Sequence, residues 1–230
     1  MNYLISFYLI LINDLKLGIS NFAGLVANSM FFVIFIMILN LTIPNQEDIK
    51  TQMVQTLTVI NICFITMING FNYQFIKEDF EDGSIDQIFL SCERLEIAIG
   101  AKVFANWIKS SWLTLIILPI YINFVFDFSQ IAVNKYQFIF KIMLVFSIIS
   151  FILNSIASLS GSISIAGSSF PLSAIIALPL MIPTILIGQI ALIQTLDNNI
   201  IFDIEILLGM AILSFIGSVF AISKIIENSR

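Results

Sequence analysis

The sequence predicts an all-α integral membrane protein with six transmembrane helices, an N-terminal interfacial helix and a short cytoplasmic helix between spans 2 and 3. Hydrophobic residues fill 59% of the 230 positions and charged residues 11%, whereas soluble domains average about 45–50% and about 25%. The mean hydropathy is +1.02. Because the apolar residues gather in runs near the roughly 20 residues that a membrane-spanning helix needs, we expect a single transmembrane domain over residues 1–230.

Residues 3–20 are expected to form an interfacial helix along the membrane surface. The apolar stretch Met1–Ile12 is too short to span the bilayer, and Asp14 and Lys16 follow it directly. This stretch also lacks the basic first segment and the small-residue cleavage site of a signal peptide.

Six apolar runs follow, and prolines lie within two of them. Pro119, Pro179 and Pro183 would kink their helices or free carbonyls for other partners. Because Pro179 and Pro183 are four residues apart, they share one helix face; they predict either a deformable helix or a static kink. The expected spans are about 22–43, 53–71, 107–126, 138–160, 174–194 and 204–223.

The positions of lysine and arginine predict the orientation, since acidic residues contribute little to it. Seven of the ten basic residues lie on the side that holds both termini and the 72–104 and 161–173 loops. We therefore expect both termini and the long loop to be cytoplasmic. These seven are Lys16, Lys77, Arg94, Lys102, Lys109, Lys224 and Arg230, against Lys50, Lys135 and Lys141.

The loop 72–104 carries the densest motif of the chain. It holds three basic and seven acidic residues, nearly the whole net charge of −5. Gly83 can end a helix and favours a positive φ there, and Ser84 with Gln87 forms a capping box that begins another. Ile85, Ile88, Phe89 and Cys92 then recur on one helix face. An acidic collar before a short amphipathic helix favours docking to a protein, because anionic lipid would repel it.

Several other function classes find little support in the sequence. Histidine is absent, which removes the commonest metal ligand and proton shuttle, and a pI near 4.6 argues against nucleic-acid binding. Asp79 and Asp82 form a DxxD pattern that could hold Mg²⁺ on a diphosphate, as in an intramembrane prenyl transferase. A second acidic cluster on the same side of the membrane is lacking, so this enzyme is the weaker interpretation.

The stretch 79–91, DFEDGSIDQIFLS, resembles the cytoplasmic motif of the haem exporter protein B family, the permease subunits of the ATP-binding cassette (ABC) system for cytochrome c maturation. The similarity continues through Ala101-Lys102 and Ala105-Asn106-Trp107, and returns in the proline-paired span 178–188. It covers essentially the whole chain. This chain departs from the family pattern in three places: Lys16 is the sole basic residue of the N-terminal helix, the loop 161–173 is uncharged, and Cys92 replaces a common proline.

The resemblance implies a non-catalytic permease subunit, in a bacterial inner membrane or a mitochondrial one, whose ATPase activity resides in a partner chain. A homodimer, a haem-handling membrane protein, a small membrane subunit and a haem chaperone are the further implied partners. No cofactor is expected to bind tightly, and haem would be a transported or handled ligand. The implied docking residues are Glu78, Asp79, Phe80, Glu81, Asp82, Gly83, Ser84, Ile85, Gln87, Ile88 and Phe89, and the implied pathway or conformational residues are Pro179, Pro183 and Gly188.

An alternative within the same architecture is a permease of an unrelated ABC exporter for lipid, polysaccharide or drug. The Mg²⁺-dependent prenyl transferase is the alternative from another class. Neighbouring genes for a cassette ATPase and cytochrome c maturation factors would separate the first two, and diphosphate-dependent activity would favour the third.

Overall fold

The computed structural model of the chain describes residues 3–20, 22–42, 49–72, 79–80, 82–85, 87, 94–125, 134–163, 170–197 and 201–229. Within these ranges the longer elements are all α-helices and no strand occurs. The predicted all-α fold is therefore confirmed for the described part of the chain. The helices are α1 (Tyr3–Ser20), α2 (Phe22–Thr42), α3 (Ile49–Asn72), α6 (Leu95–Val125), α7 (Lys135–Ile163), α8 (Phe170–Asp197) and α9 (Ile201–Asn228).

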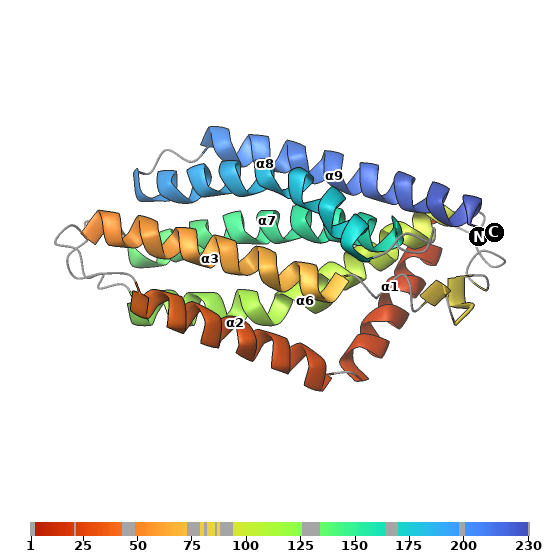
Figure 1. The fold of residues 1–230 in the computed structure, drawn as a ribbon, viewed down its shortest axis with the longest axis horizontal. Coiled ribbons are helices and arrows are strands. Elements are labelled where there is room, and N and C mark those ends of the chain that lie inside the picture. The colour runs from red at the N-terminus through yellow and green to blue at the C-terminus, as the bar shows by residue number, and fades with distance from the viewer. Residues whose placement is uncertain are drawn as a thin grey trace.

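The six longer helices run side by side along the long axis of the molecule, and α1 crosses one end of the bundle (Figure 1). The N-terminal and C-terminal ends lie together at that same end. Helix α7 is the centre of the bundle, because it packs against α3, α6, α8 and α9. Its Phe146, Ile149 and Ile152 are fully buried.

Within the described residues, four helical segments are long and apolar enough to cross a membrane: Leu95–Phe124, Lys135–Ile163, Ala177–Leu196 and Ile204–Asn228. They correspond to the last four expected spans. Within the same residues α2 (21 residues) contributes the shorter apolar segment Ser29–Ile38, and α3 carries Gln52, Gln55, Thr58 and Asn61 among its apolar residues. Helices cover both expected ranges, but the described residues do not show six spans.

Helix α1 has the bounds that the sequence predicts, 3–20, and its polarity is inverted relative to a soluble helix. Ser6 and Asp14 are buried against the protein, while Tyr8, Leu9 and Leu17 are more than half exposed. An outward apolar face of this kind is typical of a helix at the membrane interface.

Helix α6 differs from its prediction, because it begins at Leu95 rather than near residue 107. Residues 95–104 of the expected loop are therefore helical. A helix of 31 residues is about 46 Å long, against a hydrocarbon thickness of about 30 Å. The N-terminal part of α6 can thus extend beyond the bilayer, and α1 packs against α6.

Candidate functional site

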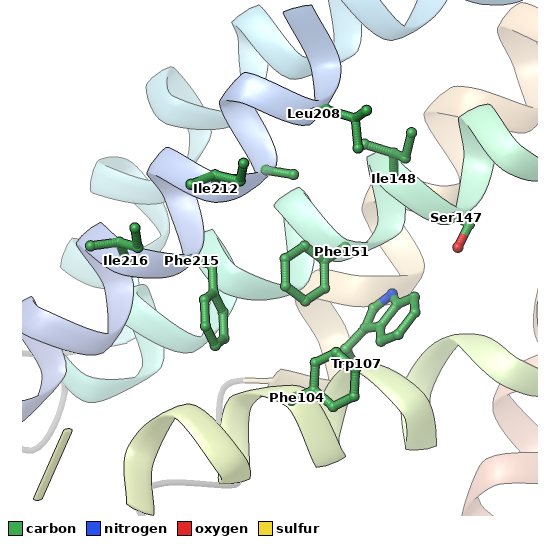
Figure 2. Close-up of a pocket in the computed structure, with 10 residues that line it drawn as sticks. Phe104, Trp107, Ser147, Ile148, Phe151, Leu208, Ile212, Phe215 and Ile216 are labelled. Carbon is green, nitrogen blue, oxygen red and sulfur yellow. The ribbon is translucent and has the colours of Figure 1, made fainter. Parts of the chain in front are cut away.

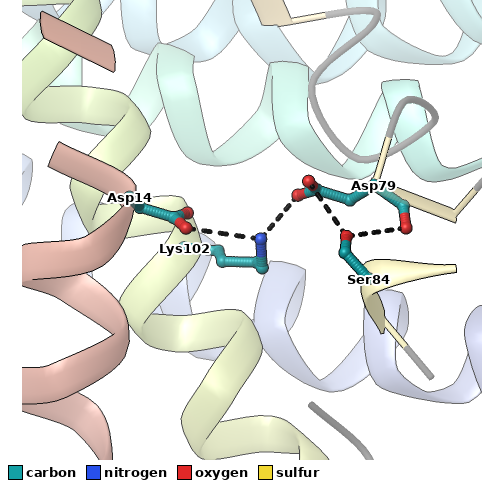
Figure 3. A network of polar contacts seen from close by, with 4 residues as sticks. All are labelled: Asp14, Asp79, Ser84 and Lys102. Carbon is teal, nitrogen blue, oxygen red and sulfur yellow. Dashed lines mark hydrogen bonds and ion pairs between the residues drawn. The ribbon is translucent and has the colours of Figure 1, made fainter. Parts of the chain in front are cut away.

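A buried lysine joins three parts of the chain at the end of the bundle where α1 lies. Lys102 of α6 donates from Nζ to Oδ2 of Asp79 at 2.6 Å and to Oδ1 of Asp14 in α1 at 3.5 Å. Only 9% of the Lys102 side chain is exposed, against 11% for Asp14 and 29% for Asp79. Figure 3 shows the ammonium group between the two carboxylates. We call Asp14, Asp79, Ser84 and Lys102 the Lys102 junction.

The acidic segment that begins at Asp79 folds into a tight turn next to Lys102. The Ser84 hydroxyl donates to the main-chain carbonyl of Asp79 at 2.9 Å and to its Oδ1 at 3.3 Å. The Gly83 amide donates to the Phe80 carbonyl at 3.3 Å, and Gly83 has a φ of 70°. The predicted positive φ at Gly83 is therefore confirmed, and it lets the chain reverse direction here.

A helical turn begins at Ser84, as the sequence predicts, but its hydrogen bonding differs from a capping box. The Gln87 amide donates to the Gly83 carbonyl at 3.4 Å, while the Ser84 hydroxyl donates to Asp79. The shorter contact of the hydroxyl is to the neutral main-chain carbonyl of Asp79, so Ser84 closes the turn back to Asp79 instead of accepting from the Gln87 amide.

An apolar cluster packs the turn against helices α6 and α9 of the bundle. Ile85, which is 5% exposed, packs with residues of α6 and α9, and Phe80 packs against their edge. Because Ile85 lies inside this chain's own core, it fastens the segment rather than facing a partner in this structure. The other members of the cluster are Leu95, Ile99, Val103, Ile222 and Ile226, with Phe215 and Val219 at the margin.

The two carboxylates of the Lys102 junction, Asp14 and Asp79, differ in their burial and in their distance from the ammonium group. Burial raises the pKa of the Asp14 carboxyl above its ordinary value, and the attraction of Lys102 and Lys109 offsets only part of that rise. Asp79 is more exposed and lies closer to the ammonium. The Lys102–Asp79 pair is therefore the stronger of the two contacts.

The predicted docking residues divide into three groups. Asp79, Ser84 and Ile85 face the bundle, with Phe80 and Gly83 half-buried. Asp82 and Gln87 are exposed. Glu78, Glu81, Ile88 and Phe89 lie outside the described residues.

The predicted pathway residues lie together on α8 but face different ways. Pro179 and Pro183 are exposed on the outer surface of the bundle. Gly188 is buried against α7 and α3: a Cβ there would lie 2.6 Å from Cδ1 of Ile149 and 3.8 Å from Nδ2 of Asn61. Gly188 therefore permits a close approach of α8 to α7.

An apolar groove of about 510 Å³ lies between α6, α7 and α9 (Figure 2). Its aromatic wall consists of Phe104, Trp107, Phe151 and Phe215, with neighbouring ring centroids 5.3–6.1 Å apart. The Trp107 indole donates to Ser150 Oγ at 3.0 Å, and among the described residues that line the groove none is ionisable. The groove thus offers no acid, base or metal ligand.

The chemistry of the Lys102 junction is that of a structural connector. Lys102 compensates the charge of Asp79, so this carboxylate does not need the metal ion that the DxxD interpretation invoked. Within the described residues, no group of three or more His, Cys, Asp or Glu side chains could hold a metal.

Sequence reasoning missed Asp14 and Lys102 as members of this site. A charged side chain is costly to bury unless it pairs, so the carboxylate of Asp14 in the apolar helix 3–20 and the ammonium of Lys102 on another helix were the available signal.

Comparison with known proteins identifies the family. The model of the CcmB protein family matches residues 5–229, nearly the whole chain. The chain belongs to the CcmB family, the haem exporter protein B family that the motif at 79–91 indicated. It is also 30% identical over 202 residues to an uncharacterized protein of Rickettsia conorii, covering 86% of each chain. As a CcmB protein it is a transmembrane ABC-type permease subunit for haem and cytochrome c biogenesis. The Lys102 junction holds Asp79 and Ser84, from the first half of this motif, against the bundle.

Proposed function

We propose that this chain is the permease subunit of an ABC complex in which a separate ATPase binds the segment 78–89 at the α1 end of the bundle. ATP hydrolysis in that partner would drive haem export or the release of a haem-loaded chaperone. The family match over residues 5–229 carries this proposal, and the geometry of the Lys102 junction supplies its mechanism.

The segment is suited to transmit force because it is fastened at one side and free at the other. Asp79 is tied to Lys102 of α6, and Ile85 is packed between α6 and α9. Asp82 and Gln87 are exposed beside these anchors. A partner that pulls or pushes the exposed side would therefore displace α6 and α9 directly, and α1 through Asp14.

The topology of the proposal is six spans with both termini and the segment 78–89 in the cytoplasm, in a bacterial inner membrane or its mitochondrial counterpart. The common placement of α1, the segment and the end of α9 at one end of the bundle supports it. The inverted polarity of α1 supports an interfacial position.

The proposed partners are a second copy of this chain, the ATPase, a haem-handling membrane protein, a small membrane subunit and a haem chaperone. Haem would be cargo and not a resident cofactor, since the chain has no histidine to ligate its iron.

The test is co-purification of the ATPase with variants of the segment, expressed at matched levels in mild detergent. Phe89 is the expected anchor, and loss of a central aromatic costs about 2 kcal/mol or more, or roughly 30-fold in affinity. Phe89→Ala should therefore release the ATPase, whereas Glu78→Ala or Glu81→Ala should weaken binding modestly and make it salt-sensitive. Full retention by Phe89→Ala together with loss by Glu81→Ala would contradict the apolar docking mechanism.

A further inference from the structure

A row of polar side chains lies between α3 and α8, in the middle of the apolar segment Ala177–Leu196. Asn61 of α3 donates from Nδ2 to the Ile185 carbonyl at 3.2 Å. Gln189 of α8 donates from Nε2 to Thr58 Oγ1 at 2.6 Å. Gln55 lies one turn before Thr58 on α3, and Thr184 lies one turn before Gly188 on α8. By this register we group Gln55, Thr58, Asn61, Thr184 and Gln189 as the α3–α8 polar seam.

Four buried oxygen atoms of the seam have no hydrogen-bond partner within the described part of the chain. They are Gln55 Oε1, Asn61 Oδ1, Thr184 Oγ1 and Gln189 Oε1. Asn61 is 1% exposed and Thr184 is fully buried. In hydrocarbon each unpaired polar group costs several kcal/mol, so four together would be a severe penalty on the fold.

Flipping the side-chain amides of Asn61 and Gln189 does not remove the cost of their unpaired oxygen atoms. The Ile185 carbonyl can only accept a hydrogen bond, so Asn61 must present its NH₂ group there and its oxygen elsewhere. Thr58 has already donated its hydroxyl proton to the Val54 carbonyl at 2.7 Å, so it too can only accept from Gln189. Both amide oxygens are therefore fixed as unpaired acceptors.

The helix register places Asn61 and Thr184 near one another. Asn61 bonds to residue 185 and lies 3.8 Å from where a Cβ of Gly188 would be. Thr184 is one turn before Gly188 on the same buried face of α8. The Thr184 hydroxyl can both donate and accept a hydrogen bond, so it suits a ligand that can also do both.

We propose that the α3–α8 polar seam binds ordered water at the centre of the bundle. Water supplies the donors that the amide oxygens lack and can bridge them to Thr184, as buried waters commonly do with two to four polar partners. None of the four unpaired oxygens belongs to a carboxylate, which is the ligand that divalent cations such as Ca²⁺ and Mg²⁺ usually require in proteins. The seam therefore suits water better than a divalent cation. The site concerns the α3–α8 contact and requires neither the ATPase nor haem.

A hydrated seam also bears on the prolines of α8. Water bridges can exchange when two helices shift, so α8 can move along α3 without leaving these oxygens unpaired. Pro179 and Pro183, on the outer face of the same helix, reduce its internal hydrogen bonding.

The test compares two isosteric Thr→Val changes on α8 in purified protein reconstituted in nanodiscs. Thr195 is also fully buried, but its hydroxyl donates to the Leu192 carbonyl at 2.6 Å. If water binds the seam, Thr184→Val should lower Tm by about 2–4 °C, at least as much as Thr195→Val. An unchanged or raised Tm for Thr184→Val would overturn the proposal, because removing a hydroxyl that is truly unpaired relieves its burial cost.

Hydroxyl-radical footprinting gives a second readout that does not depend on stability. Met181 is 1% exposed and lies one turn before Thr184 on the same buried face. Radicals formed in seam water should oxidise Met181 in the wild type, and several-fold more slowly in Asn61→Leu. Equal Met181 oxidation in the two proteins would overturn the water site. So would a Thr184→Val effect that vanishes in monomers, because a second copy would then supply the donors.

Discussion

Replacing Lys102 by methionine should free the segment 79–87 from the bundle. Breaking a buried ion pair costs about 3–5 kcal/mol, whereas an exposed pair is worth about 1 kcal/mol or less. Since Asp79 is 29% exposed and Asp14 11%, we expect an intermediate cost of about 2 kcal/mol. If the substitution lowers the free energy of local opening by this amount, the population of molecules with a detached segment rises roughly 30-fold. Each increment of about 1.4 kcal/mol changes an equilibrium constant tenfold.

The assay is maleimide labelling of Ile85→Cys in a background without Cys63 and Cys92. Ile85 is 5% exposed, so its replacement reacts only when the segment opens. Adding Lys102→Met should accelerate labelling roughly 30-fold, in line with the cost above. Lys102→Arg keeps the charge and should change the rate much less.

Lys224→Met is the matched control, because it removes an exposed lysine paired with Glu227 at 2.7 Å. It should leave the labelling rate unchanged. If Lys102→Met labels at the rate of the Lys224→Met control, the junction does not hold the segment, and the reasoning is refuted.

Three further predictions concern glycine and proline. Gly83→Val should release the segment and Gly83→Asn should largely retain it, measured by ATPase co-purification, because space is open there and only the φ of 70° is restrictive; equal loss would refute this. Gly188→Ala should lower Tm by several degrees in the wild type and by less in Ile149→Val, which lacks the Cδ1 atom 2.6 Å from the added Cβ but keeps a Cγ atom at about the 3.0 Å of Cγ1; additive effects would contradict it. Pro179→Ala with Pro183→Ala should reduce cytochrome c maturation without disrupting assembly; normal maturation would leave both prolines as static features.

The helical architecture could be predicted from the sequence because long apolar runs have few alternatives in a membrane. The N-terminal helix 3–20 is confirmed at both ends. The start of α6 was missed because Glu96 and Lys102 make its first turns appear soluble. Helix α1 covers that part of α6, which hydropathy alone does not reveal.

The site was predictable only in its local features. The positive φ at Gly83 followed from residue type, and a helical turn does begin at Ser84. The pairing of Asp79 with Lys102, 23 positions later, and with α1 through Asp14 depends on tertiary packing. The amphipathic stripe predicted that Ile85 would dock on a partner protein, whereas in the structure Ile85 packs against α6 and α9 of the same chain.

The most direct test of the proposed function is photocrosslinking from the exposed side of the segment to the ATPase subunit. A photoreactive amino acid at Gln87, which is exposed beside the Lys102 junction, should crosslink to the ATPase in intact membranes. The same amino acid at Tyr136, which is 82% exposed at the start of α7, serves as the control and should not. Crosslinks from position 136 but not from position 87 would place the ATPase at the opposite end of the bundle and contradict the account.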